Sequence, residues 1–161
     1  MTTRGRHPPA GTGPAPLPVP VELDEVECRR LLATATVGRI SFTDDALPAM
    51  VPVPFALAEG QVLIPAQDGD AMVAAVRGAV VAFGVDSFDP ATETGWSVTV
   101  VGPSRVLGDP ARLTALSRAG LPQHWTGPGR RLVAVQLGLL RGWRRKRDPA
   151  DSYHSTDTSA W

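Results

Sequence analysis

A series of short apolar segments separated by turn residues runs through residues 38–102, and it constrains the fold more than any other feature of the sequence. Ile40 and Phe42 alternate with polar residues, as in a strand with one buried face. Residues 80–85 are almost all apolar, as in a central strand buried on both faces. With one segment nearer the C-terminus, the pattern predicts six strands, at residues 37–42, 50–57, 61–64, 80–85, 96–107 and 131–137.

The second predicted strand contains two prolines, Pro52 and Pro54. Because proline has no N–H to donate to a neighbouring strand, this strand is expected at an edge or at a barrel opening. The dipeptide Glu59-Gly60 predicts a hairpin turn to the third strand. Residues 86–94 are polar and predict a connection before the fifth strand.

Three short helices are predicted between the strands. Residues 23–33 form the first, with Asp24 as N-cap and Glu27 as its capping-box partner. Asp70 caps the second, and Asp109-Pro110 begins the third. Three helices are too few to supply the crossover connections that a parallel sheet needs. The predicted fold is therefore mainly β, an antiparallel barrel of six strands with short helices inserted.

The chain has 161 residues, a length that fits one folded domain. Residues 1–20 hold six prolines and few large apolar side chains, and they are predicted to be a disordered arm. A proline-rich ligand for a partner domain is the alternative. Residues 21–143 form the predicted barrel domain, and residues 144–161 form a predicted disordered tail, first basic and then polar.

Basic residues cluster around Trp143 near the C-terminus, at Arg141, Arg144, Arg145, Lys146 and Arg147. Basic and aromatic side chains in alternation can bind single-stranded nucleic acid. The whole chain has 16 basic and 16 acidic residues, so no global field attracts nucleic acid. A solvated tail is the favoured interpretation, and nucleic acid is not an expected partner.

Composition disfavours several other classes of protein. Residues 71–85 are interrupted by Arg77 and fall short of the ~20 apolar residues that a membrane span needs. No apolar stretch follows the basic residues Arg4 and Arg6, so no signal peptide is predicted and the cytoplasm is the expected location. With 1 Cys and 3 His residues, neither a zinc site nor an intrachain disulfide is expected.

Three side chains with possible chemistry have two interpretations each. Cys28 lies beside Arg29 and Arg30, whose charges would lower a thiol pKa, but a structural thiol is favoured. For His124, a solvated loop histidine is favoured over a general acid. For Trp96, a place in the core or at a dimer interface is favoured over ligand stacking. No catalytic residue is assigned.

Five short motifs follow one another along the chain: Gly38-Arg39-Ile40, Pro48-Ala49-Met50-Val51-Pro52-Val53-Pro54-Phe55, Val81-Ala82-Phe83-Gly84-Val85-Asp86, Gly95-Trp96-Ser97-Val98 and Trp125-Thr126-Gly127. Their order and spacing resemble the FMN-binding split barrels of the pyridoxamine 5′-phosphate oxidase family, over about residues 23–143. The resemblance implies a six-stranded split barrel that forms a homodimer. It also implies FMN or another small molecule in the groove between subunits, and redox chemistry carried by the flavin. Some relatives use a deazaflavin or haem instead.

The resemblance also indicates which residues face the cofactor. The backbone of residues 49–54 is expected to lie along the isoalloxazine ring, and later segments hold the phosphate. Carried over to this sequence, the cofactor-binding residues are Met50, Val51, Pro52, Val53, Pro65, Ala66, Asp70, Ala71, Met72 and Trp125. For Trp125, simple packing is an equally weighted alternative.

The phosphate-holding positions depart from the family pattern. Family members carry Arg, Lys, Ser or Thr there, whereas residues 64–72 of this chain contain none of these. A phosphate takes its strongest contacts from cations, so ordinary FMN binding is in question. Arg39, Arg77 or Arg105 would have to substitute from elsewhere. The alternative is a non-enzymatic relative that binds another small molecule and no FMN.

Overall fold

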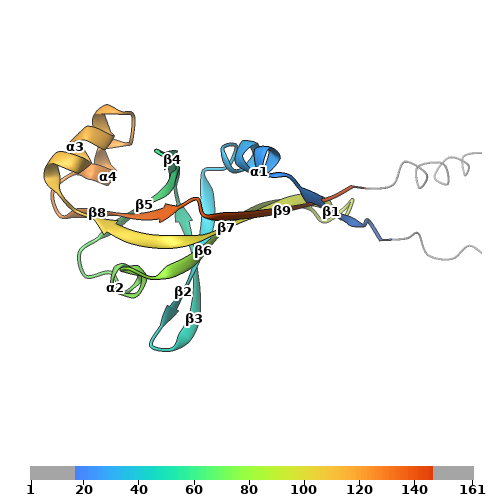
Figure 1. Cartoon of the computed structure of the whole chain (residues 1–161), viewed down its shortest axis with the longest axis horizontal. Helices are drawn as coiled ribbons and strands as arrows, with labels where there is room; N and C mark the ends of the chain where they lie inside the picture. The colour runs from blue at the N-terminus through green and yellow to red at the C-terminus, as the bar shows by residue number, and fades with distance from the viewer. Residues whose placement is uncertain (1–16, 147–161) are drawn as a thin grey trace, which may run out of the picture.

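The computed structural model describes residues 17–146 as one curled antiparallel sheet with four short helices (Figure 1). The strands are β1 (Pro20–Leu23), β2 (Val37–Asp44), β3 (Leu47–Pro54), β4 (Ala56–Ala58), β5 (Gln61–Gln67), β6 (Val80–Asp89), β7 (Thr94–Leu107), β8 (Arg130–Gln136) and β9 (Leu139–Arg145). The helices are α1 (Glu25–Leu32), α2 (Ala71–Val76), α3 (Pro110–Arg118) and α4 (Gln123–Thr126).

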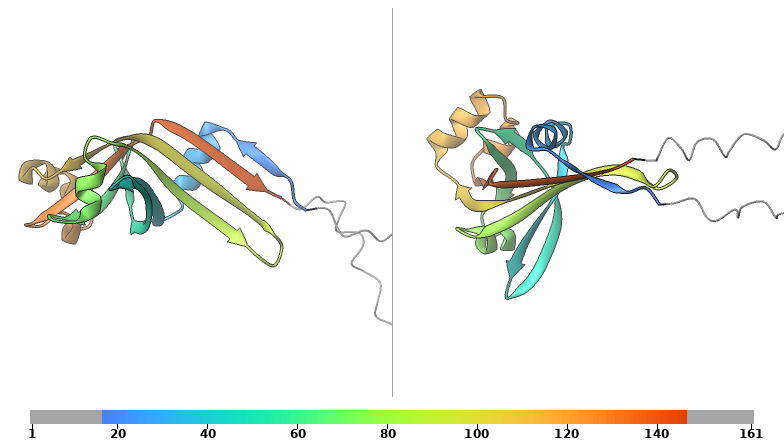
Figure 2. Two further views of the ribbon diagram at one scale, coloured as in Figure 1. Left: turned by 90° about the horizontal axis from the view of Figure 1, so that it is seen from below. Right: turned by 45° about the vertical axis from the view of Figure 1, so that its right-hand side comes forward.

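The sheet follows the order β3-β2-β6-β7-β8-β5-β4, with every pairing antiparallel. The first half of the long strand β7 pairs with β9, which also pairs with β1, and its second half pairs with β8. Gly102 lies at this change of partner, and a Cβ atom there would lie 2.1 Å from the Gln136 carbonyl oxygen. Only glycine permits this approach, which lets the sheet curl into a half-barrel (Figure 2).

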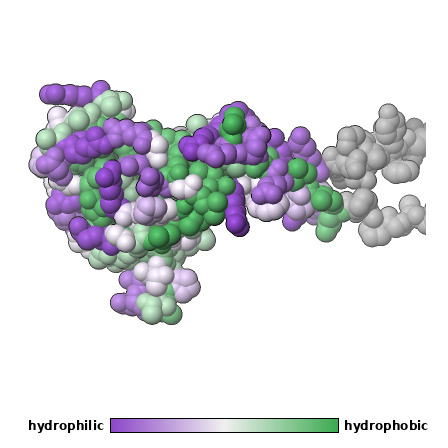
Figure 3. Space-filling view, in the orientation of Figure 1, coloured by the Kyte–Doolittle hydropathy of each residue, from purple (hydrophilic) through white to green (hydrophobic). Residues whose placement is uncertain are grey.

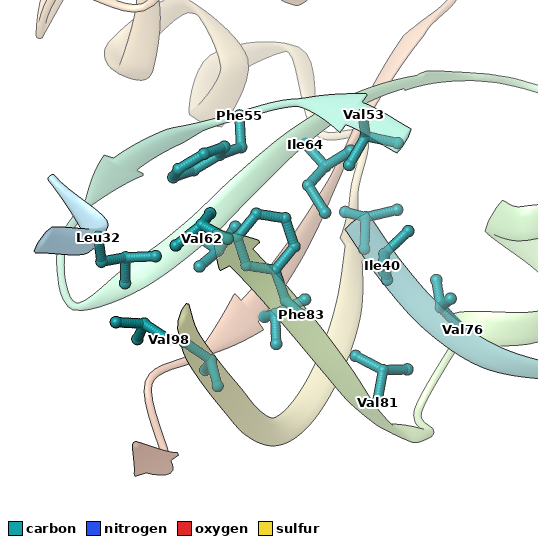
Figure 4. Close-up of a cluster of buried hydrophobic side chains, with 14 of the residues drawn as sticks. Leu32, Ile40, Val53, Phe55, Val62, Ile64, Val76, Val81, Phe83 and Val98 are labelled. Carbon is teal, nitrogen blue, oxygen red and sulfur yellow. The ribbon is translucent and has the colours of Figure 1, made fainter. Parts of the chain in front are cut away.

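The main hydrophobic core lies on the inner face of the curled sheet (Figure 4). Phe83 of β6 is fully buried there and meets Phe55 edge-on, with ring centroids 4.8 Å apart. Ile40 of β2 and Val98 of β7 are also fully buried in this cluster. Helices α1 and α2 cover the inner face and bury five side chains in it: Cys28, Leu31, Leu32, Val73 and Val76.

A second, smaller core joins strands β5 and β8 to helices α3 and α4 at the helical end of the molecule (Figure 1). Leu113 and Leu116 of α3 are buried in it. Asp109 caps α3, because its carboxylate accepts a hydrogen bond from the Arg112 N–H at 2.8 Å. The helix start predicted at Asp109-Pro110 is thereby confirmed.

Strands β6 and β7 continue past the half-barrel together with β9 and β1 as an extended arm (Figures 1 and 2). Helix α1 is tied to this arm through Glu27, whose carboxylate lies 2.6 Å from the Arg144 guanidinium of β9 and 2.7 Å from that of Arg30. Hydrogen bonds from Arg30, and then from Arg144, lower the pKa of Glu27 to about 2. The carboxylate is therefore charged wherever the protein is folded near neutral pH.

Several predictions from local sequence signals are confirmed. The fold is mainly β and antiparallel with short helices. The proline-containing strand β3 is an edge strand. Asp24 caps α1 by accepting from the Glu27 N–H at 2.8 Å. The hairpin at Glu59-Gly60 joins β4 to β5, with φ angles of 52° and 70°.

Other predictions were wrong in detail. The described residues form nine strands rather than six, because β1 and β9 were not foreseen and the predicted strand at residues 50–57 is divided into β3 and β4. Strand β6 continues to Asp89, so the predicted polar connection over residues 86–94 is mostly strand. Only one face of β6 is buried, since Val80 is 70% exposed on the other. His124, expected in a loop, lies in helix α4.

The basic segment around Trp143 was expected to be a solvated tail. As far as Arg145 it instead forms strand β9. Its backbone is paired on both sides, with β7 and with β1, and Arg144 is held by Glu27. The folded part thus runs from β1, which begins at Pro20, to Arg145 at the end of β9. Residues 1–16 and 147–161, which include most of the predicted arm and tail, lie outside the described residues.

Candidate functional site

The outer face of β3, β2, β6, β7, β9 and β1 is left uncovered by the helices of residues 17–146, which pack on the inner face or over β5 and β8. Directly paired residues of neighbouring strands project from the same face of a sheet. Two rows therefore share the outer face: Arg39, Gly84, Thr99 and Arg141, and next to it Asp86, Ser97, Trp143 and Glu22. The middle of the face is lined by small side chains, and its borders carry charged and aromatic ones.

Strand β3 forms one edge of this face, and its prolines decide which backbone groups stay available. Just past β3, the Phe55 N–H donates to the Thr36 carbonyl oxygen on the β2 side at 3.1 Å. Because backbone groups alternate in direction along a strand, even-numbered residues of β3 point to the free edge. These residues are Pro48, Met50, Pro52 and Pro54. Only Met50 supplies an N–H, so the edge presents carbonyl acceptors and a single donor.

The four β3 residues predicted to line the cofactor divide between the two faces. Met50, 64% exposed, and Pro52 belong to the outer face. Val53 is buried in the main core, and Val51 packs against it from the same side. A ligand on the outer face can therefore touch the side chains of Met50 and Pro52, and can touch the two valines only through their backbone.

The remaining phosphate-side residues lie around the turn between β5 and α2: Pro65, Ala66, Asp70, Ala71 and Met72. Ala66 is buried in the core, and Met72 packs against it. The Asp70 carboxylate accepts a hydrogen bond from the Gln67 N–H at 2.9 Å, and its side chain does not cap α2. Asp70 thus occupies the N-cap position as predicted, but its carboxylate turns back to close the preceding turn.

Sequence reasoning missed a cation beside this turn, Arg131 of β8. Arg131 is paired in register with Ala66, and its guanidinium lies 2.8 Å from the Asp68 carboxylate. Antiparallel pairing of the third and sixth predicted strands was the signal that could have located it. The arginines considered as substitutes lie on β2, at the end of α2 and on β7: Arg39, Arg77 and Arg105.

The turn between β5 and α2 does not fit the terminal phosphate of FMN. Two carboxylates, Asp68 and Asp70, lie in it, and the arginine beside it is already paired with Asp68. A phosphate that carries nearly two negative charges gains its strong contacts from cations and is repelled by carboxylates. A flavin bound by this chain would need another place for its phosphate.

Trp125, predicted to face the ligand or to pack, is 8% exposed and belongs to the second core. The structure favours packing, with the His124 ring edge-on to it at a centroid distance of 6.2 Å. Cys28 is buried, and burial, together with neighbouring carboxylates, raises its pKa. The structural interpretation of Cys28 stands, and the alternative of a thiol activated by the adjacent arginines is wrong.

An open hollow of about 420 Å³ lies on the outer face of the arm. Its lining comes from all four strands of the arm: Pro20, Asp86, Phe88, Gly95, Trp96, Ser97, Trp143 and Arg145. Phe88 and Trp143 are 56% and 46% exposed, which is unusual for large apolar side chains. In the space-filling view, apolar surface (green) appears in the middle of the molecule and along the arm (Figure 3).

The part of the chain that the structure describes contains neither a cluster of metal ligands nor a membrane-spanning helix. No group of three or more His, Cys, Asp or Glu side chains is placed to hold a metal ion within residues 17–146. None of the helices in this range is long and apolar enough to cross a membrane.

The curled antiparallel half-barrel with short helices places the chain in the class of split-barrel proteins. A family model described as pyridoxamine 5′-phosphate oxidase matches residues 24–141. The chain therefore belongs to the pyridoxamine 5′-phosphate oxidase family. The resemblance inferred from the five sequence motifs is thereby confirmed.

Individual relatives agree with this assignment. The chain is 40% identical over 130 residues to the uncharacterized protein Rv0080 of Mycobacterium tuberculosis, covering 77% of this chain and 84% of that protein. It is 31% identical to a FAD binding protein from Mycobacterium smegmatis, with a TM-score of 0.63 over 78% of this chain and 98% of that chain. A FAD and haem binding protein from the same organism shares the fold at 16% identity, with a TM-score of 0.66, 85% of this chain and 80% of that chain.

Proposed function

We propose that this chain is a cytoplasmic flavin-binding redox protein that works as a homodimer, with the flavin in a groove between two copies. The observation that carries the proposal is the uncovered outer face of the sheet, bounded by the acceptor-rich edge of β3. Support also comes from the relative with 31% identity, which is a FAD binding protein.

The β3 edge suits one side of the isoalloxazine ring. That side carries an N–H between two carbonyl groups, so the ring can donate to a β3 carbonyl and accept from the Met50 N–H. The turn beside Asp68 and Asp70 does not suit the FMN phosphate. FAD is the proposed cofactor rather than FMN, because the relative that is 31% identical is a FAD binding protein. Bound flavin supplies the electron or hydride transfer, and the protein supplies position and surroundings.

Exposed apolar side chains on the same face support the homodimer. They occur on β2, β3, β6 and β9: Val37, Met50, Val80 and Leu139. Several exposed large apolar side chains on one face commonly mark an interaction site. A second copy placed over the face would bury it and would close one wall of the flavin groove.

A second candidate is a non-enzymatic relative that binds no flavin, and the carboxylates of the β5–α2 turn favour it. In that case the outer face would serve to join two copies or to hold another small molecule.

The test is to titrate the purified full chain with FAD and with FMN, following flavin fluorescence and visible absorbance, and to measure its mass in solution. We expect a dimer that binds FAD at micromolar concentrations and whose bound flavin can be reduced. Met50→Glu should weaken both dimer and flavin binding, because it charges the outer face. Val26→Glu, on exposed α1, is the matched control and should change neither. No binding at saturating FAD and FMN would establish the second candidate.

A further inference from the structure

We infer that the outer face of the arm binds the adenosine diphosphate half of the flavin dinucleotide. The cofactor then lies across the sheet, from the β3 edge to the hollow between Phe88 and Trp143. The inference rests on the proposed function and extends it to residues of β6, β7 and β9.

The two ends of this path lie on one continuous surface. Arg39 of β2 is paired with Pro52 of β3 on one side and with Gly84 of β6 on the other. Neighbouring strands lie ~4.8 Å apart, so β6 is about 10 Å from β3 along the face. The hollow begins at Asp86, two residues further along β6. A ligand anchored at the β3 edge can therefore reach the hollow without leaving the face.

The row between these ends suits a diphosphate. Gly84 and Thr99 form its floor, with Arg39 at one end and Arg141 at the other. A Cβ atom on Gly84 would meet nothing closer than the Val98 carbonyl oxygen at 3.9 Å, so the space above it is open. Arginine is the side chain best suited to paired contacts with phosphate oxygens.

Charge on this part of the face is compatible with an anionic ligand. Arg39, Arg141 and Arg145 lie on it together with Asp86 and Glu22. Arg39 is paired with Asp86 at 2.6 Å, and both side chains are about half exposed. Exposed pairs of this kind are weak, so a diphosphate can replace Asp86 as the partner of Arg39. The three arginines outnumber the two carboxylates.

The hollow suits a planar base. Phe88 stands on β6 and Trp143 on β9, and between them β7 contributes Gly95, Ser97 and Trp96. Gly95 and Ser97 are paired in register with residues of both neighbouring strands on the outer face, and both are small. Large aromatic walls beside a floor of small residues leave a slot in which a base can stack. The volume of about 420 Å³ lies within the range of small-molecule sites. A second copy of the chain is the competing occupant, and the experiment below distinguishes it.

The experiment compares FAD, FMN and ADP as ligands of the full chain, by calorimetry and tryptophan fluorescence. We expect FAD to bind about tenfold or more tightly than FMN, and ADP alone to bind and to change the tryptophan emission. Trp143→Leu and Arg141→Gln should each lower FAD affinity about tenfold, the size expected for one stacking contact or one charged hydrogen bond. Trp143→Leu should leave FMN affinity unchanged, because FMN has no adenine. Gly84→Leu should block FAD, since its side chain would occupy the floor, where a Cβ atom meets no backbone atom closer than 3.9 Å.

Matched controls are Val26→Leu and Arg118→Gln, which alter exposed residues of α1 and α3 away from the face. Solution mass and thermal unfolding show whether each variant remains folded and dimeric. Equal affinity for FAD and FMN, no ADP binding, or a Trp143→Leu variant that weakens both flavins alike would overturn the inference. If neither flavin binds, the proposed function fails. The ADP titration then decides alone: binding that Trp143→Leu removes supports the nucleotide site, and no binding overturns it.

Discussion

The two faces of strand β6 differ strongly in how far their apolar side chains are exposed to solvent. On the inner face Val81, Phe83 and Val85 are each at most 3% exposed, whereas Val80 and Phe88 on the outer face of the same strand are 70% and 56% exposed. Apolar side chains stabilise the fold only where burial removes them from water. The inner face thus holds the structure together, and the outer apolar residues remain available for a ligand or a second copy.

The largest expected effect comes from a pair of phenylalanines on β6. Phe83→Ala should lower the free energy of unfolding by ~3–5 kcal/mol, because it leaves a cavity beside Phe55 in the core. Phe88→Ala should change it by about 0.5 kcal/mol or less in the monomer. Urea denaturation of both variants measures the difference. Equal losses would show that Phe88 is also part of the monomer core.

Two glycines of the sheet allow a similar comparison between a position with close backbone contact and an open one. Gly102→Ala should destabilise the fold by ~1–3 kcal/mol or more, because its methyl group would overlap the Gln136 carbonyl oxygen. Gly84→Ala, which points into open space, should be close to neutral. Thermal unfolding followed by circular dichroism is the measurement. A stable Gly102→Ala variant would mean that β7 does not change partners as described.

Two serines of β7 make a third pair. Ser104 is 3% exposed and its hydroxyl donates to the Val76 and Ala79 carbonyl oxygens, which tie α2 to the sheet. Ser104→Ala should lower the free energy of unfolding by ~1 kcal/mol, because a buried hydroxyl hydrogen bond is lost while both carbonyl oxygens keep their backbone donors. Ser97→Ala, on the outer face, should cost about 0.5 kcal/mol or less. Chemical denaturation at one pH measures both free energies of unfolding. Equal losses in the two variants would contradict a stabilising role of the Ser104 hydroxyl.

The smallest effect depends on pH and concerns the link between α1 and the arm. Glu27 has a folded pKa of about 2 against an ordinary value of 4.5, so its charge stabilises the folded state above pH 4.5. That contribution disappears as the pH falls from 4.5 to 2. The wild type should therefore be more stable than Glu27→Gln at neutral pH and should converge with it in acid. Glu93→Gln, outside this network, is the control in the same denaturation series; a constant difference across pH would refute the linkage.

Local signals were sufficient where the structure is decided locally. The caps Asp24 and Asp109, the Glu59-Gly60 turn and the alternation around Ile40 depend on residues within a few positions of one another. Strand β9 was missed because its many arginines look solvated, and only pairing with β7 and β1 makes it a strand.

The difference between local and long-range contacts also explains which features of the candidate site could be predicted. The lack of cationic side chains in residues 64–72 can be read directly from the sequence. That Arg131 lies beside them, and that Arg39 and Arg141 share a row with Gly84, follows only from the register of strands distant in sequence. The residues that share the outer face could therefore not be predicted from any single segment of the sequence.

The prolines of β3 have a consequence for how copies of this chain can meet. An edge strand with regular N–H and C=O groups can recruit a strand from another molecule and extend the sheet. Pro48, Pro52 and Pro54 remove three of the four donors along the free edge, so an incoming strand finds no complementary ladder. Two molecules can then associate face against face, but they cannot join their sheets through this edge. A surface that stays open to binding is in this way protected from fibrous assembly.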